Sequence, residues 1–114
     1  MLTIEALRQA GVNTKEGLGR LMNNEAFYLR LVNMALDDAG FEKLAAAISN
    51  HDNKAAFEAA HALKGVLGNL SLTPLYEKMS ELTELLRAEK DADYALLVQE
   101  ILAQRDSLNK LRKS

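Results

Sequence analysis

Apolar residues recur at alternating intervals of four and three positions through the middle of the chain, and this spacing constrains the fold more than any other feature. The residues that follow it are Ala56, Ala60, Leu63, Leu67 and Leu70. Side chains at such intervals line one face of an α-helix, whereas side chains in a strand alternate with a period of two. The spacing predicts a long amphipathic helix over residues 53–70, which must bury this face against other parts of the chain.

The rest of the chain carries similar spacing, punctuated by residues that begin and end helices. The expected helices cover residues 3–10, 14–22, 24–49 with a bend at Gly40, 53–70, 73–88 and 91–111. The expected N-caps are Thr3, Thr14, Asp52 or Asn53, Thr73, and Asp91 or Asp93. In the helix that begins near Asn24, the residues expected to share one face are Phe27, Leu31, Met34 and Ala35, with Tyr28 and Val32 beside them.

The composition agrees with an all-helical protein. Of the 114 residues, 48% are hydrophobic and 26% are charged, and the chain has one proline. This length suits one domain, and four long helices with short connections favour a bundle. We therefore expect a single all-α domain over residues 1–114, built as an up-down antiparallel four-helix bundle with short extra N-terminal helices.

Composition and charge also exclude several classes of function. The chain has no cysteine and two histidines, so we expect no disulfide, no metal site and no other cofactor. Its net charge is −2, and no basic stripe offers a surface for nucleic acid. No stretch approaches the roughly 20 apolar residues that a membrane span requires. We expect a soluble, cytoplasmic monomer that binds neither nucleic acid nor a membrane.

A strip of unusual residues lies on the predicted outer face of the 53–70 helix. His61, Lys64, Gly65 and Gly68 stand at helical spacing, and Phe57 lies one turn before the histidine. Each glycine within a helix costs about 1 kcal/mol relative to alanine. We interpret the strip as a docking surface around a nucleophilic histidine, cleared by the two glycines and supplied with a cation by Lys64. A solvated histidine beside glycines that permit a close helix crossing is the alternative from the pattern alone.

The residues around His61 resemble the histidine-containing phosphotransfer (HPt) domains of bacterial phosphorelays. The hallmark of that family is His-x-x-Lys-Gly, commonly preceded by alanine, and "AHALKG" fits it directly. The similarity extends to "GLGRLMNNEAFYLRLVNMALDD" and "LAAAISNHDNKAAFEAAHALKG" upstream, and downstream through Gly68, Leu70 and the helix from Pro74. It covers nearly the whole chain.

The sequence departs from the family pattern at a few positions. Val66 and Leu67 follow the Lys-Gly pair, where many members have small or polar residues, and Ser71 stands where glycine or alanine is common. Members often use a glutamine or glutamate of the next helix to orient the histidine. The matching position is Thr83, with Glu84 beside it, so the resemblance marks these two residues as candidate orienters of His61.

The resemblance implies that His61 accepts a phosphoryl group from an aspartate of a receiver domain and donates it to another, while Lys64 stabilises the group. The expected partners are receiver domains of response regulators and a hybrid sensor kinase. Because the receiver would bring the Mg²⁺ and the carboxylates, we expect a phosphocarrier rather than an enzyme. His51, in "NHDN", is expected to be a loop residue without a role.

Two other interpretations stay open at this point. The bundle could be a protein-binding adaptor whose histidine is never phosphorylated, or the phosphoacceptor domain of a larger sensor kinase. A phosphorylation assay with a phospho-receiver distinguishes the first, and the extent of the natural chain distinguishes the second.

Overall fold

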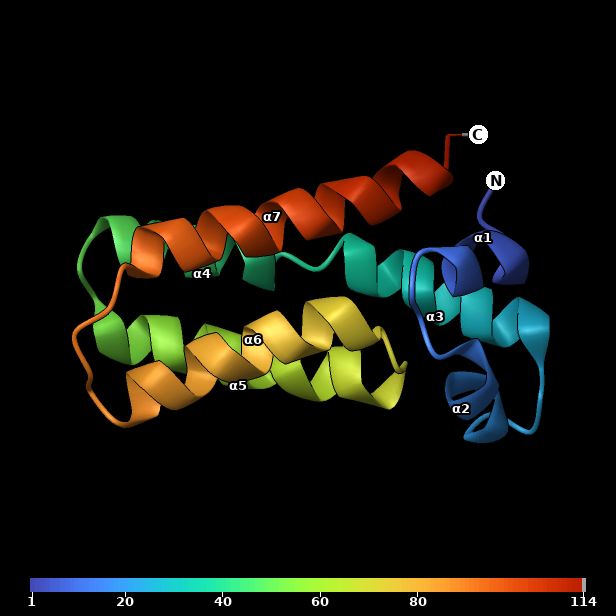
Figure 1. Cartoon of the computed structure of the whole chain (residues 1–114), viewed down its shortest axis with the longest axis horizontal. Helices are drawn as coiled ribbons and strands as arrows, with labels where there is room; N and C mark the ends of the chain where they lie inside the picture. The colour runs from blue at the N-terminus through green and yellow to red at the C-terminus, as the bar shows by residue number, and fades with distance from the viewer. Residues whose placement is uncertain (114) are drawn as a thin grey trace.

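The computed structural model describes residues 1–113, and over this range it contains seven helices and no strand (Figure 1). The helices are α1 (Ile4–Gln9), α2 (Thr14–Gly19), α3 (Glu25–Leu36), α4 (Gly40–Ser49), α5 (Asn53–Asn69), α6 (Thr73–Arg87) and α7 (Tyr94–Leu111). The prediction of an all-α fold is confirmed.

Helices α4 to α7 form the bundle. Each packs against the next in the chain, and α7 returns to contact α4, so the four helices enclose one core (Figure 1). Short turns join them, and each helix therefore runs antiparallel to its sequence neighbour. Helix α3 lies nearly end to end with α4. At that end of the molecule, α2 packs against α3, and α1 packs against α2 and α7. The bundle with short N-terminal helices is as the sequence predicts.

The predicted apolar face of α5 is buried. Ala56, Ala60 and Leu67 are fully inaccessible to solvent, and Leu63 retains 2% of its exposure. These side chains meet a core that is mostly leucine, with Tyr28 and Phe41 as its largest members. Burial of this face fixes the rotation of α5, and the opposite face is thereby held toward solvent.

The buried face of α3 differs from the one expected from its pattern. The residues that reach the core are Tyr28, Val32, Ala35 and Leu36, whereas Phe27 is 37% exposed and Met34 is 62% exposed. The two faces are separated by one residue, about 100° of rotation, so the pattern was compatible with either. On the buried face, the Tyr28 hydroxyl donates a hydrogen bond to the Leu70 carbonyl oxygen at 2.7 Å, which ties this face of α3 to the end of α5.

The expected bend at Gly40 is a complete break between two helices. Helix α3 ends at Leu36, and α4 begins at Gly40, whose backbone N–H donates to the Asp38 carboxylate at 2.7 Å. A Cβ at Gly40 would also lie 3.1 Å from carbon atoms of Leu63. The local hydrogen bond and the close approach to α5 therefore favour a new helix over a continued one.

Three of the expected N-caps are confirmed, and two are wrong. Thr3, Asp52 and Asp93 each accept a backbone N–H from the residue three positions later. The remaining two helices begin one residue off the prediction: Asn13 caps α2 in place of Thr14, and Leu72 occupies the N-cap position of α6 in place of Thr73.

Arg20, just after α2, anchors the N-terminal segment to the end of α5. One guanidinium nitrogen donates to the Gly68 and Asn69 carbonyl oxygens at 3.2 and 3.1 Å and to the Ser71 hydroxyl at 2.6 Å. The last carbonyl groups of a helix have no donor within the helix, so a cation here satisfies them and complements the helix dipole.

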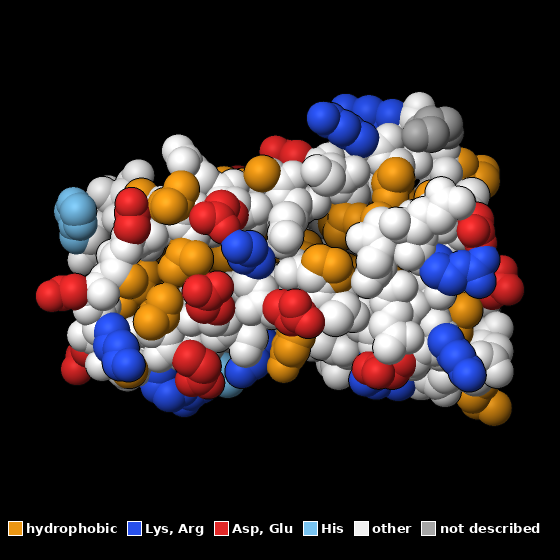
Figure 2. Space-filling view, in the orientation of Figure 1, with side chains coloured by type: hydrophobic (Ala, Val, Ile, Leu, Met, Phe, Trp, Pro, Cys, Tyr) orange, Lys and Arg blue, Asp and Glu red, His pale blue; other side chains and the backbone are white. Residues whose placement is uncertain are grey.

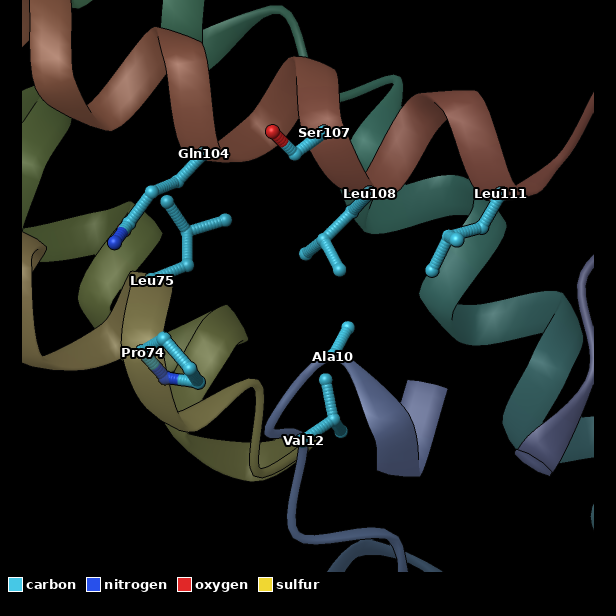
Figure 3. Close-up of a pocket in the computed structure, with 8 residues that line it drawn as sticks. All are labelled: Ala10, Val12, Pro74, Leu75, Gln104, Ser107, Leu108 and Leu111. Atoms are coloured by element: carbon cyan, nitrogen blue, oxygen red, sulfur yellow. The ribbon is translucent and has the colours of Figure 1, made fainter. Parts of the chain in front are cut away.

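A cavity of about 340 Å³ opens between the end of α1, the start of α6 and the second half of α7 (Figure 3). It is lined by Ala10, Val12, Pro74, Leu75, Gln104, Ser107, Leu108 and Leu111. Elsewhere on the surface, basic and acidic side chains are interspersed across the face shown in Figure 2. None of the helices within residues 1–113 is long and apolar enough to span a membrane.

Candidate functional site

His61 lies on the outer face of α5, as the helical spacing predicts. Its neighbours Ala60 and Leu63 point into the core, and the imidazole is exposed to solvent. The position is near the middle of a 17-residue helix, where the backbone is held by hydrogen bonds on both sides. The histidine is therefore an accessible side chain on a rigid support.

The imidazole stacks on the ring of Phe57, one turn earlier in α5. The two ring centroids lie 5.6 Å apart, and the ring planes are inclined by 10°. On α6, the guanidinium of Arg87 lies 5.1 Å from the centroid of the same phenyl ring. Phe57 is half-buried between the two helices, so it supports the imidazole from one side and limits the directions in which it can turn.

Lys64 lies one turn beyond His61 and leans toward α6. Its side chain retains 23% of its exposure, and its Nζ lies 3.8 Å from the Glu84 Oε1 atom. The other carboxylate oxygen of Glu84 accepts from the Arg87 Nε at 3.0 Å. The cation next to the histidine is thus paired with a carboxylate that a second cation also contacts.

The two glycines of the strip have different surroundings. A Cβ at Gly65 would meet no atom within 4 Å, which is the open space expected beside the histidine. A Cβ at Gly68 would lie 3.0 and 3.2 Å from two ring carbons of Tyr76 on α6. The expected clearing is present at Gly65, but at Gly68 the space is filled by an aromatic ring. That glycine permits a close contact between α5 and α6, which the glycine pattern alone does not distinguish from a clearing.

The two candidate orienters on α6 are placed differently, and among the described residues no hydrogen bond joins either of them to the imidazole. Thr83 is fully buried, and its hydroxyl donates to the Met79 carbonyl oxygen at 2.7 Å within its own helix. This use of the hydroxyl hydrogen is common for threonine inside helices. The structure therefore turns Thr83 toward the core and away from the outer face of α5. Glu84 does face α5, but the residue it contacts there is Lys64.

Sequence reasoning missed two residues of α6 that contact the strip, Tyr76 and Arg87. Tyr76 precedes Thr83 by two helical turns, and Arg87 follows Glu84 by one turn. This helical spacing from residues already marked is the sequence signal that could have found them. What the sequence does not contain is the register of α6 against α5. Only that register determines which glycine an aromatic ring covers.

The other histidine, His51, lies outside this site. His51 is exposed in the turn between α4 and α5, with a φ of 56°. Within the part of the chain that the structure describes, no group of three or more His, Cys, Asp or Glu side chains is arranged to hold a metal ion.

The Hpt domain family model matches residues 31–113. The match includes α4 to α7 and the second half of α3, and it places His61 and its strip well inside the family region. The chain therefore belongs to the Hpt domain family, whose members carry phosphoryl groups on histidine in phosphorelays. No curated protein and no solved structure shows a significant match to the chain.

Proposed function

We propose that His61 is the phosphoacceptor of this Hpt domain, taking a phosphoryl group from an aspartyl phosphate of a receiver domain and returning it to the aspartate of another. The observation that carries the proposal is the exposed imidazole on the outer face of α5, stacked on Phe57 with Lys64 one turn away. Of the two histidines in the chain, His61 is the one that stands in the His-x-x-Lys-Gly pattern.

Phosphoryl transfer to histidine requires a neutral imidazole that can approach the phosphorus atom without obstruction. A lone pair on an imidazole nitrogen attacks the phosphorus of the aspartyl phosphate, the P–O bond to the carboxylate breaks, and the aspartate leaves as a carboxylate. In its neutral form, an imidazole offers this lone pair on one of its two ring nitrogens. Phosphoryl transfer depends mostly on positioning and charge stabilisation.

The neighbouring residues support this step in different ways. Phe57 limits the rotation of the imidazole, and the open space at Gly65 lets a bulky receiver approach it. Lys64 supplies positive charge for the transferred group, which carries nearly two negative charges at neutral pH. The Mg²⁺ and the acidic residues of the transfer reaction would come from the receiver, which makes the domain a phosphocarrier without catalytic machinery of its own.

A transfer assay tests the assignment directly. Receiver domains of the same organism are phosphorylated with labelled phosphate and mixed with wild-type protein, His61→Gln or His51→Gln. We expect acid-labile label on the wild type and on His51→Gln, and none on His61→Gln, with the same melting temperature for all three. Label that persists on His61→Gln and disappears from His51→Gln would move the site to the turn before α5. Receiver binding without label on any variant would indicate an adaptor in place of a phosphocarrier.

A further inference from the structure

The Glu84 carboxylate on α6 holds the cation that a phosphoryl group on His61 would need. Lys64 Nζ lies 3.8 Å from Glu84 Oε1, and both belong to the surface that surrounds the histidine. The lysine side chain is less exposed than the glutamate, at 23% against 54%, so the lysine lies along α6 and does not extend into solvent. In the unphosphorylated protein, Lys64 therefore already has an anionic partner.

A phosphoryl group on His61 would compete with Glu84 for this partner. Residues three positions apart on a helix are neighbours, so Lys64 can reach a group attached to the imidazole by turning away from α6. One ammonium group cannot hold both anions at full strength. Arg87 gives Glu84 a second cation, at 3.0 Å from its Oε2, and so keeps the carboxylate from being left alone when Lys64 moves.

We propose that Glu84 is a positioning residue that acts through Lys64 and weakens the hold of the domain on its phosphoryl group. The inference rests on the proposed function of His61. With Glu84 present, Lys64 must leave one anion to stabilise another. Lys64 therefore stabilises the phosphohistidine by a smaller free energy than a lysine without an anionic partner would. The carboxylate thereby keeps the phosphohistidine easy to discharge, which suits a carrier that must both accept and donate.

Replacement of Glu84 by glutamine shows the size of the effect. The amide keeps the shape of the side chain and removes its charge, so Lys64 is free to pair with the phosphoryl group. Exposed ion pairs contribute little to stability, and the usual size of that contribution corresponds to a change in equilibrium of about 1.4- to fivefold. Glu84→Gln should therefore shift the distribution of phosphoryl groups toward His61 by about that factor.

The experiment is a competition at equilibrium. Equal amounts of wild-type protein and a Glu84→Gln variant of distinguishable mass share one limiting pool of label through a small amount of receiver, which exchanges phosphoryl groups between the two histidines. The ratio of labelled variant to labelled wild type measures their relative affinity for the phosphoryl group. Glu81→Gln is the matched control, because Glu81 is exposed on the same helix one turn before Glu84.

A second pair of variants identifies Lys64 as the route of the effect. Lys64→Ala competes with the double variant Lys64→Ala/Glu84→Gln under the same conditions. We expect a ratio of about 1.4 to five for Glu84→Gln against wild type. The ratio should fall toward one in the Lys64→Ala background. If Glu84→Gln damaged the structure instead, its label or its melting temperature would fall. Such damage would not produce a rise in label that depends on Lys64.

The outcomes separate this inference from the function on which it rests. If wild-type protein takes no label on His61, the proposed function fails, and this inference fails with it. If His61 is labelled and Glu84→Gln matches wild type, or if Glu81→Gln gives the same shift, the function stands and the role of Glu84 is refuted. A shift that survives in the Lys64→Ala background would refute the route through Lys64.

Discussion

Substitution of the two glycines by alanine gives opposite expectations, because the structure places them in different surroundings. At Gly65 a Cβ would meet no atom within 4 Å, so alanine adds no strain. Alanine then contributes its helix propensity, about 1 kcal/mol over glycine within a helix. For a chain of this size, the gain in the free energy of unfolding corresponds to a rise in melting temperature of about 4 °C.

At Gly68 the same methyl group would come within 3.0 Å of the Tyr76 ring. Non-bonded carbon atoms are most stable at about 3.5 to 4.0 Å, so the ring must move by several tenths of an ångström. Overpacking a well-packed site costs about 1 to 3 kcal/mol, which offsets the helix propensity or exceeds it. We expect Gly68→Ala to leave the free energy of unfolding unchanged or to lower it, and to differ from Gly65→Ala by about 1 kcal/mol or more.

Urea denaturation followed by circular dichroism at 222 nm measures both variants. The control for the contact is Tyr76→Ala, a background in which Gly68→Ala should recover the gain that Gly65→Ala shows in the wild type. Equal stabilisation by the two alanine variants in the wild-type background would refute the contact between Gly68 and Tyr76. A loss of stability in Gly65→Ala would show that the space beside Gly65 is not open.

Two further predictions concern the packing of the N-terminal part and its response to pH. Tyr28→Phe should lower the free energy of unfolding by about 1 to 2 kcal/mol in urea denaturation, since it removes the buried hydrogen bond to the Leu70 carbonyl; an unchanged midpoint would show that the hydroxyl adds nothing. Hydrogen bonds from Arg112 hold the pKa of the Asp37 carboxyl below its ordinary value of 3.8. A lowered pKa contributes stability that is present above the ordinary value and is lost as the pH falls through the lowered one. The melting temperature of Asp37→Asn should therefore fall less than that of the wild type between about pH 5 and pH 2. An equal fall in the two proteins would refute a contribution of the Asp37 carboxylate to stability.

Helix α5 could be predicted well because its information is local. The 4-3-4-3 spacing sets the buried face by itself, and Asp52 sets the start through one hydrogen bond to a backbone N–H three residues later. Once that face is fixed, His61 must point outward whatever the helix packs against. The prediction of an exposed histidine beside Lys64 therefore needed no knowledge of the other helices.

The surroundings of the strip could not be predicted because they depend on a neighbouring helix. Whether a glycine faces solvent or an aromatic ring is set by the register of α6, and the sequence contains no local signal for it. Thr83 shows the same limit. The family pattern marks its position as facing the histidine, whereas its hydroxyl donates to the Met79 carbonyl and its side chain lies in the core. Long-range packing decided both cases.

Residues 1–30 precede the region that the family model matches, yet several of them contact the end of α5 directly. The family match begins at residue 31, yet Tyr28 donates to the Leu70 carbonyl, and burial raises the pKa of that phenol to about 12. A Cβ at Gly17 would lie 2.8 Å from the same carbonyl oxygen, so α2 approaches α5 as closely as only glycine allows. Arg20 completes the contact by donating to the last carbonyls of α5. Removal of residues 1–30 would therefore take away the side-chain donors to the Gly68, Asn69 and Leu70 carbonyl oxygens at the end of the histidine helix.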